Sequence, residues 1–330
     1  KYLTCDPVIL DRPPAPEPGH KYLLYAHIPF CETLCSYCTF HRFLFKEEKA
    51  RAYFVNLRKE MQLVKDLGYD FTGMYVGGGT TTILEDELVR TLEYARELFP
   101  GIREVCITTN GVLLPELAVP LRHAGVRRLN ISLDTLDAEK YAFITRCGTL
   151  SQAMAGIEAA LSAGYDKVKL NAVLIGGFND DEIGALAALT REYPVDMRFI
   201  ELMPMGDNGF GKEAYLPYTA VLAALPELTP VGEDGGAAKL YRLPGAKGNV
   251  GLISPVSAHF CGDCNRLRLT ADGKLKPCLH SPAEVPIKGL GREEMAERMK
   301  EAILGKPEWH GALNYENRSG SQRSMNRIGG

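Results

Sequence analysis

The chain has 330 residues, of which 45% are hydrophobic and 24% are charged, an ordinary balance for a globular protein. Its formal net charge of -3 excludes a chain that is basic throughout, so we expect no nucleic-acid partner. The sequence contains neither an apolar run of about 18 residues nor a basic leader followed by an apolar stretch. We therefore expect no membrane span and no secretory signal.

Composition divides the chain into three expected parts. Residues 1–21 are rich in proline and are expected to form an extended arm on the surface. Residues 22–210 alternate β-rich runs with helical patterns, which predicts parallel strands joined by right-handed crossovers. About six such units fit in this part, fewer than the eight of a complete barrel, so we predict an α/β fold with a partial barrel or an open sheet. Residues 211–330, with glycine-rich irregular stretches, form the third part.

The expected elements follow one another in a regular order. The strands predicted from short β-rich runs are 22–28, 71–76, 104–108, 126–133, 167–175 and 195–200. The helices predicted from the apolar spacing are 47–67, 84–99, 115–124, 151–163, 180–192 and 292–303. In parallel α/β folds, sites gather at the carboxyl ends of the strands. Four stretches follow such ends and mark the expected site: 31–38, 77–79, 108–110 and 132–134.

Three cysteines directly follow the first expected strand. Cys31, Cys35 and Cys38 have the spacing C-x3-C-x2-C, and thiolates so close suit an iron–sulfur cluster or zinc. A structural zinc ion would need a fourth protein ligand. A 4Fe-4S cluster held by three cysteines keeps one iron open for a substrate or cofactor. The triplet therefore predicts a cluster site, with a structural zinc knuckle as the alternative.

A second triplet lies near the end of the chain. Cys261, Cys264 and Cys278 again supply three thiolates, and here zinc with His280 as fourth ligand is the alternative to a second cluster. Between the last two cysteines, alternation places Arg266 and Arg268 on one face of an extended segment. Paired guanidinium groups fit phosphate oxygens through bidentate hydrogen bonds, although a solvated edge strand would explain the same pattern.

Six of the nine cysteines belong to these triplets. Such spacing is typical of metal sites rather than of a disulfide framework and favours a reducing, cytoplasmic location. Cys106 lies in an apolar strand-like run and is most simply a small core residue. Cys5 and Cys147 have no partner that the sequence identifies.

The first triplet, with Tyr37 just before its third cysteine, resembles the radical S-adenosylmethionine (SAM) superfamily. This resemblance implies that the open iron binds SAM. It also implies that an electron from the cluster splits SAM into methionine and a 5'-deoxyadenosyl radical.

From about Thr108 to the end, the chain resembles the GTP 3',8-cyclase family of molybdenum cofactor biosynthesis. The motifs that carry this resemblance are 130–134, 199–206, 251–257, 261–270 and the terminal Gly329-Gly330. The resemblance implies an incomplete (β/α)6 TIM-like barrel whose open side is closed by the C-terminal part. It also implies conversion of GTP to 3',8-cyclo-7,8-dihydro-GTP, because the radical takes the hydrogen at C3' and the resulting carbon radical attacks C8.

The same resemblance assigns cofactors and site residues. It implies two 4Fe-4S clusters and SAM, with guanine bound at the open iron of the second cluster. The residues expected at SAM are Tyr37, Gly78, Ser132 and Met203. Those expected at GTP are Thr108, Lys169, Arg198, Arg266 and Arg268, with Gly329 and Gly330 reaching the active site.

Two of these assignments have simpler alternatives. Lys169 is explained equally well as a charge on a strand, and Arg198 as one partner of an ion pair with Asp196 or Glu201. As partners, the resemblance implies GTP, a reducing electron donor and, downstream, cyclic pyranopterin monophosphate synthase. Whether the chain forms a homodimer is left open.

The first third resembles a different group, the radical SAM enzymes of porphyrin chemistry, through 27–31, 37–40 and 76–82. The cyclase family's arginine, seven residues before the first cysteine, falls on Leu24. Two of its basic residues become Thr72 and Met74, and its SAM-contacting glutamate becomes Gly79. The chain thus looks like two radical SAM relatives joined near residues 100–110, as a natural recombinant, an engineered chimera or a designed sequence.

Two other functions compete with a cyclase on these grounds. The first third favours an enzyme that acts on a porphyrin or haem, but a tetrapyrrole needs no second triplet with its arginines. A non-catalytic iron–sulfur or zinc protein is the other alternative.

Overall fold

The computed structural model describes most of the chain. The described residues are 16, 19, 21–35, 38, 41–205, 210–233, 237–259, 261–264, 267–270, 274–287, 289–311, 313 and 319–321. Four residues of the expected site lie outside these ranges, namely Tyr37, Arg266, Gly329 and Gly330, as does most of the expected N-terminal arm. Within the described ranges, no helix has the length and apolar character needed to cross a membrane.

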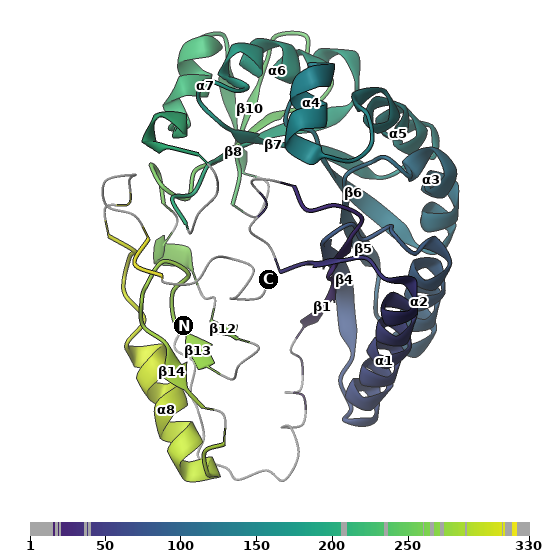
Figure 1. Cartoon of the computed structure of the whole chain (residues 1–330), viewed down its shortest axis with the longest axis vertical. Coiled ribbons are helices and arrows are strands. Elements are labelled where there is room, and N and C mark those ends of the chain that lie inside the picture. The colour runs from purple at the N-terminus through teal and green to yellow at the C-terminus, as the bar shows by residue number, and fades with distance from the viewer. Residues whose placement is uncertain are drawn as a thin grey trace.

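A nine-stranded sheet forms the centre of the molecule (Figure 1), in the order β1-β4-β5-β6-β7-β8-β11-β10-β9. Its first six strands are mutually parallel. They are β1 (Tyr22–Ile28), β4 (Phe71–Gly78), β5 (Glu104–Thr109), β6 (Val126–Ser132), β7 (Lys167–Leu174) and β8 (Val195–Glu201). The edge strands are β1 and β9, so in the described part of the chain the sheet curves without closing. The predicted α/β fold with a partial parallel barrel is confirmed.

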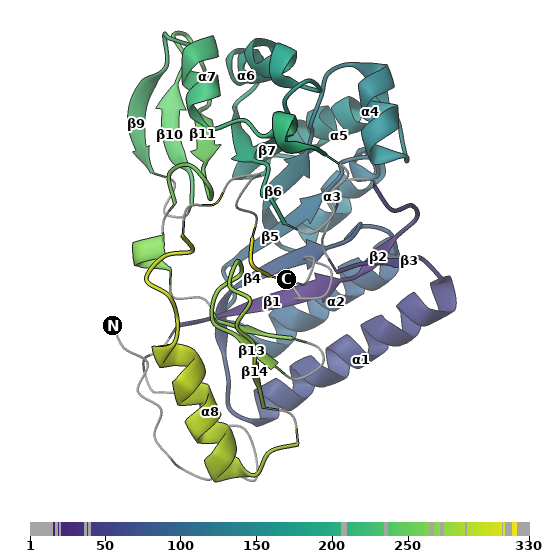
Figure 2. The same ribbon diagram turned by 60° about the vertical axis from the view of Figure 1, so that its left-hand side comes forward.

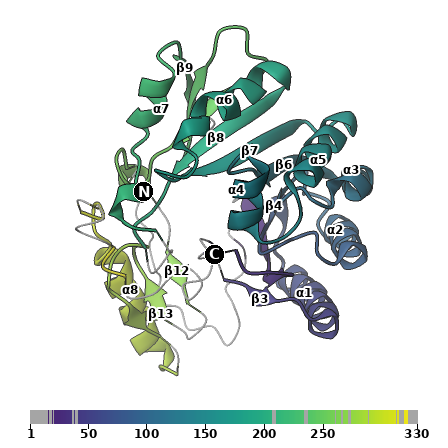
Figure 3. The same cartoon turned by 45° about the horizontal axis from the view of Figure 1, so that its top comes forward.

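The crossover helices cover the outer face of the curved sheet, as Figures 1 and 3 show. They are α1 (Glu47–Asp66), α2 (Glu85–Leu98), α3 (Leu114–His123), α5 (Leu150–Ser162) and α6 (Ile183–Glu192), the last preceded by the 3-10 turn η1 (Asp180–Glu182). All five lie where the apolar spacing predicts a helix. The short helix α4 (Ala138–Thr145) was not predicted, because its eight residues give too brief a pattern.

Strand alternation gives this sheet two different faces. In β7, the side chains of Val168 and Leu170 are buried towards the helices, whereas those of Lys169 and Asn171 are half-buried on the other side. We call this other side the inner face. A parallel sheet usually buries apolar residues on both faces, so a polar inner face indicates a functional surface.

Three further strands extend the sheet beyond residue 210. β11 (Val250–Ile253) pairs in parallel with β8, and β10 (Lys239–Arg242) and β9 (Thr229–Glu233) follow it in antiparallel fashion. The part of the chain that composition separates from the barrel therefore begins by adding strands to the barrel sheet.

The remaining C-terminal elements stand across the opening of the curved sheet from α1 (Figures 1 and 2). The predicted helix is present as α8 (Arg292–Leu304), beside a three-stranded sheet. The strands of that sheet are β12 (Arg268–Leu269), β13 (Lys274–Lys276) and β14 (Val285–Pro286). The other short elements are β2 (Phe30–Cys31), β3 (Phe43–Leu44), α7 (Thr219–Ala224) and the turns η2 (Lys212–Ala214) and η3 (Cys261–Asp263).

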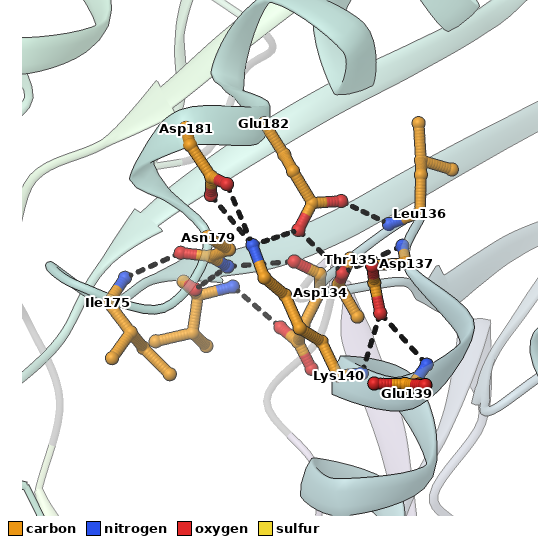
Figure 4. Close-up of polar contacts among 11 residues, drawn as sticks. Asp134, Thr135, Leu136, Asp137, Glu139, Lys140, Ile175, Asn179, Asp181 and Glu182 are labelled. Atoms are coloured by element: carbon orange, nitrogen blue, oxygen red, sulfur yellow. Dashed lines mark hydrogen bonds and ion pairs between the residues drawn. The ribbon is translucent and has the colours of Figure 1, made fainter.

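Buried polar side chains fix the loops at the carboxyl ends of β6 and β7 (Figure 4). The fully buried Asn179 accepts from Ile175 N at 2.8 Å and donates to Asp134 O at 2.7 Å and Val173 O at 2.9 Å. The Asp134 carboxylate accepts from Val173 N at 2.8 Å. These bonds hold the loop that follows Ser132 against the end of β7.

Ion pairs of Lys140, on α4, also connect the loops that follow β6 and β7. Its ammonium group lies 2.8 Å from Asp181 and 3.0 Å from Glu182. Glu182 also accepts from Thr135 Oγ1 and Leu136 N.

We expect Asn179→Ala to lower the free energy of unfolding by about 3 kcal/mol, because it leaves buried backbone groups of both loops without partners. Urea titration of the metal-free protein, followed by circular dichroism, measures this change. Asn56→Ala, on the exposed side of α1, is the matched control and should change it by less than about 0.5 kcal/mol. Equal effects of the two substitutions would contradict the role given to Asn179.

Candidate iron–sulfur and substrate site

The first cysteine triplet lies at the carboxyl end of β1. Cys31 is buried in β2, and Cys35 and Cys38 follow in the loop. Burial raises the pKa of Cys31, and it raises the pKa of Cys35 to about 12; in both cases the charge of Cys38 adds to the effect. The thiols are therefore near enough to influence one another, as the spacing predicts.

The glycine run at the carboxyl end of β4 packs against the segment that carries this triplet. The backbone N–H of Gly79 donates to Ile28 O at 2.7 Å, and that of Thr80 donates to Phe30 O at 2.8 Å. A Cβ atom on Gly79 would lie 2.7 Å from Cys31 Sγ. Only glycine fits here, so the absence of the family's glutamate at this position is built into the local packing.

Gly78 is constrained in a second way. Its φ of +124° is a conformation that glycine adopts readily, and a Cβ there would lie 2.5 Å from Ile28 O. The expected SAM residue Gly78 therefore lies in backbone contact with the strand that leads into the triplet.

Three residues that the sequence analysis did not identify also surround the first triplet. Thr80 donates hydrogen bonds to the Cys31 sulfur, which partly offset the effect of burial on its pKa. Arg42 donates to the carbonyl oxygens of Cys35, at 2.8 Å, and of Cys38. The Cys35 thiol donates to Thr145 O at 3.2 Å. Thr80 and Arg42 lie close to the motifs in sequence, whereas Thr145 ends the helix that was not predicted.

Cys147, which had no partner from the sequence, also lies beside this triplet. Its charge contributes to the raised pKa of Cys35, although burial contributes more.

Four expected site residues share the inner face of the sheet. Register places Thr108 beside Asn130, Asn130 beside Lys169, Ser132 beside Asn171, and Asn171 beside Arg198. Their alternation with buried apolar residues turns these side chains away from the helices. The structure thus brings Thr108, Ser132, Lys169 and Arg198 onto one surface.

Hydrogen bonds join this surface into a continuous polar belt. The hydroxyl of Tyr75 contacts Thr108 Oγ1 at 2.5 Å and accepts from Asn130 Nδ2 at 3.2 Å. Arg198 donates to Asn130 Oδ1 at 3.0 Å and to Asn171 Oδ1 at 2.8 Å. The belt crosses β4 to β8 and orients the guanidinium group of Arg198 through neutral amides.

Two details differ from the sequence analysis. Asp196 is suggested by the sequence as an ion-pair partner of Arg198. Its carboxylate instead forms an ion pair with the ammonium group of Lys167, at 2.8 Å, and accepts hydrogen bonds from Asn249. Cys106 does not face the core. It lies on the inner face, where its sulfur accepts from Asn130 Nδ2 at 3.5 Å, because alternation gives the core positions to Val105 and Ile107.

The inner face changes character at β1 and β4. Leu24 and Met74, which stand at basic positions of the cyclase family, pack into the core under the helices. Tyr25 and Tyr75 lie side by side on the opposite face with stacked rings, their centroids 5.9 Å apart. Tyr25 Oη also contacts His27 Nδ1 at 3.0 Å. This wall is aromatic, in contrast to the cationic strands β6 to β8.

The second triplet lies around β12 and β13. Burial raises the pKa of Cys261, and the charges of Cys278 and Cys264 add to it, so these thiols are also close together. The backbone N–H of His310 donates to the Cys261 sulfur. Arg268, on β12, lies near enough to His280 to help lower the pKa of that imidazole, which burial chiefly brings to about 4.

A buried carboxylate ties the second triplet to the barrel. Glu201, at the end of β8, accepts from the backbone N–H groups of Tyr218, Val256 and Ser257 at 2.8 to 3.0 Å. The loop that it fixes offers Pro255 O to His310 Nε2 at 2.9 Å. Since His310 contacts Cys261, the position of the triplet depends on the last barrel strand.

Met203, the remaining expected SAM residue, packs with Met205 and Leu279. Leu279 is the neighbour of Cys278, so the segment after β8 lies against the loop of the second triplet. Of the residues expected at the site, all that the structure describes therefore lie on the inner face of the sheet or beside one of the triplets.

Comparison with known proteins decides the family. A family model of the radical SAM superfamily matches residues 25–190, and one named Molybdenum Cofactor Synthesis C matches residues 195–312. GTP 3',8-cyclase from Alkaliphilus oremlandii is 40% identical over 94% of this chain and 97% of its own length. The enzyme of the same name from Pelotomaculum thermopropionicum is 46% identical over 74% of this chain and 77% of its own length.

The chain belongs to the GTP 3',8-cyclase family, within the radical SAM superfamily. Membership is not confined to the segment after Thr108, because the Alkaliphilus match covers nearly the whole chain. Among solved structures, coproporphyrinogen III oxidase from Escherichia coli matches with a TM-score of 0.55 and 18% identity, covering 65% of this chain and 55% of the oxidase. That match shows a shared fold.

Membership in the superfamily implies one 4Fe-4S cluster and SAM, and the first triplet fits this group. Among the described residues, no three His, Cys, Asp or Glu side chains are gathered to hold a single metal ion. The soft thiols of Cys31, Cys35 and Cys38 are the kind of donor that holds such a cluster.

We expect Gly79→Ala to lower the iron content at the first triplet by more than half, because its methyl group would displace Cys31 Sγ or Phe30 O. Iron analysis after anaerobic reconstitution measures this loss, and SAM cleavage should fall with it. Gly184→Ala is the control, since a Cβ at Gly184 of α6 meets no atom within 4 Å. Full iron loading of Gly79→Ala would refute the steric constraint.

Proposed function

We propose that this chain is a radical SAM GTP 3',8-cyclase that converts GTP to 3',8-cyclo-7,8-dihydro-GTP. Its relatives bear that name and match the chain over almost its full length. The structural observation that carries the proposal is the polar belt on the inner face, in which Thr108 and Arg198 join one hydrogen-bonded network.

The proposal gives each part of the site a task. Cys31, Cys35 and Cys38 hold a cluster that supplies reducing electrons for SAM cleavage, while Tyr37, Gly78, Ser132 and Met203 bind SAM. Register supports the place of Ser132, since it shares one row of the inner face with Asn171 and Arg198. A radical formed from SAM beside Ser132 would thus be released close to the GTP residues.

Cys261, Cys264 and Cys278 hold the second cluster of this proposal. The donor set again consists of soft thiols, and a buried polar atom beside them supports a bound group. His280 is 7% exposed, and its Nδ1 atom is buried without a hydrogen-bond partner among the described residues. Buried polar atoms are normally satisfied, so a group held by these thiols would explain the orphaned nitrogen.

Charge supports a nucleoside triphosphate as the substrate. Such a ligand carries about four negative charges, which Lys169, Arg198, Arg266 and Arg268 are proposed to balance through charge-assisted hydrogen bonds. Because β1 and β4 present Tyr25 and Tyr75 to the inner face instead of cations, phosphate binding rests on strands β6 to β8 and on the arginines of the second triplet.

The proposal has further components. An external electron donor reduces the clusters, and cyclic pyranopterin monophosphate synthase takes up the product. Gly329 and Gly330 reach into the site, and the chain acts in the cytoplasm. A homodimer is compatible with all of these components and necessary for none of them.

Anaerobic incubation of the reconstituted protein with SAM, dithionite and GTP tests the proposed reaction. We expect about eight irons per chain, as two four-iron clusters require, and a cyclised GTP product identified by mass spectrometry. If the rate of 5'-deoxyadenosine release does not change when GTP is added, the assignment of GTP as substrate is wrong. A reconstituted protein that contains zinc but no iron would refute the proposal that the chain is a radical SAM enzyme.

Lys169→Met tests the cationic strands. Loss of one charge-assisted contact should weaken GTP binding about 10- to 100-fold, measured by calorimetry on the reconstituted protein without reductant. Lys59→Met removes one charge from the exposed side of α1 and should leave the dissociation constant unchanged. Unchanged binding in Lys169→Met would remove this lysine from the substrate site.

A further inference from the structure

A lysine from outside the cysteine motifs reaches the second triplet. Lys306 follows the C-terminal end of α8, where its backbone N–H donates to Ile303 O at 3.2 Å. Its ammonium group donates to Pro277 O at 2.9 Å and lies 3.6 Å from Cys264 Sγ, within hydrogen-bonding distance for sulfur. The charge of Lys306 also acts on Cys261 and opposes the rise in its pKa.

Two separate contacts therefore hold a cation at this triplet. The bond to Pro277 O fixes the ammonium group beside Cys278, the next residue, while the contact with Cys264 directs one N–H at a sulfur. His310, four residues further along, adds its backbone N–H to Cys261. The segment 306–310 thus supplies hydrogen-bond donors to two thiols of one site.

The electrostatic consequence depends on the charge of what these thiols bind. One-electron reduction makes an iron–thiolate group more negative by one charge, whereas the lysine keeps its single positive charge. Hydrogen bonds to the sulfurs and nearby charge are among the factors that set the potential of such a group. A cation within 4 Å stabilises the reduced form more than the oxidised form.

We infer that Lys306 raises the reduction potential of the second cluster by placing its charge against Cys264. This inference rests on the proposed function, because it requires the second cluster. Lys306 is a positioning and tuning residue: it touches a ligand of the cluster and is assigned no contact with substrate. Arg42, its nearest counterpart at the first triplet, donates to backbone carbonyl oxygens. Lys306 instead donates to a cluster ligand itself.

The test is a potentiometric titration of the full reconstituted chain, followed by electron paramagnetic resonance. Lys306→Met should lower one of the two midpoint potentials, with the equilibrium constant for reduction falling about tenfold, or about 59 mV for one electron. Lys306→Arg keeps the charge and should restore most of the shift. Replacing Cys31, Cys35 and Cys38 with serine in the same variants identifies the shifted cluster.

Lys300→Met is the matched control, since it removes the same charge from the surface of α8, where Lys300 pairs with Glu297 at 2.8 Å. Both potentials should stay unchanged in that variant. Unchanged potentials in Lys306→Met, or equal shifts in the Met and Arg variants, would overturn the inference, because the effect would then not follow the charge.

The iron content of each reconstituted variant shows whether the substitution removes a cluster instead of changing its potential. Loss of four irons in Lys306→Met but not in Lys306→Arg supports a charge-dependent role, and loss in both overturns it. About four irons in the unaltered chain would instead reject the second cluster, and with it this inference. That result is distinguishable because it appears before any lysine is changed.

Discussion

The site depends on a parallel sheet that buries only one of its two faces. Helices α1, α2, α3, α5 and α6 cover the outer face (Figure 1), and the buried apolar side chains of the barrel strands form one core cluster with them. Alternation then forces the intervening residues onto the inner face, where Thr108, Asn130 and Arg198 lie on three different strands. Because all these strands are parallel, their carboxyl ends share one edge, and the loops with the cysteines and glycines emerge there.

Local patterns in the sequence were sufficient for most of the barrel. The six parallel strands and the five crossover helices between Tyr22 and Glu201 lie where the sequence pattern predicts them, because each has a period long enough to recognise. Helix α4 was not predicted because its eight residues are too few to show a clear period. The continuation of the sheet through β11 could not be predicted either, since pairing between β11 and β8 joins residues about fifty positions apart.

In the candidate site too, local motifs were visible in the sequence, whereas contacts between distant segments were not. The cysteine triplets and the expected residues Ser132, Lys169 and Arg198 were identified from motifs, and register places these three residues on one face of the sheet. The contacts of Thr145 with Cys35 and of Lys306 with Cys264 join segments more than forty residues apart. Neither residue type has a metal-binding signature of its own, so only the folded chain identifies them.

In the structure, the glycine run and the cysteine loop of the first third are close neighbours. A Cβ atom on Gly79 would lie 2.7 Å from Cys31 Sγ, and Gly78 has a backbone conformation that suits glycine, so the glycine run and the cysteine loop pack closely together. Replacing only the glycines or only the cysteine loop would create a clash. The two segments that resemble porphyrin-related enzymes therefore pack against each other, within a chain that matches the cyclase family over nearly its whole length.

Aromatic residues lie on the inner face of β1 and β4, whereas Leu24 and Met74, at basic positions of the family, pack into the core. Tyr25 and Tyr75 stack on the inner face of the same two strands, β1 and β4, that support the cysteine loop. Tyr75 is nevertheless bonded to Thr108 and Asn130, so the aromatic wall is continuous with the polar belt. A substrate held by cations on β6 to β8 would meet flat, apolar rings opposite them, an arrangement that suits a ligand with a charged group at one end and a planar group at the other. A nucleotide has this form, which agrees with the proposed substrate.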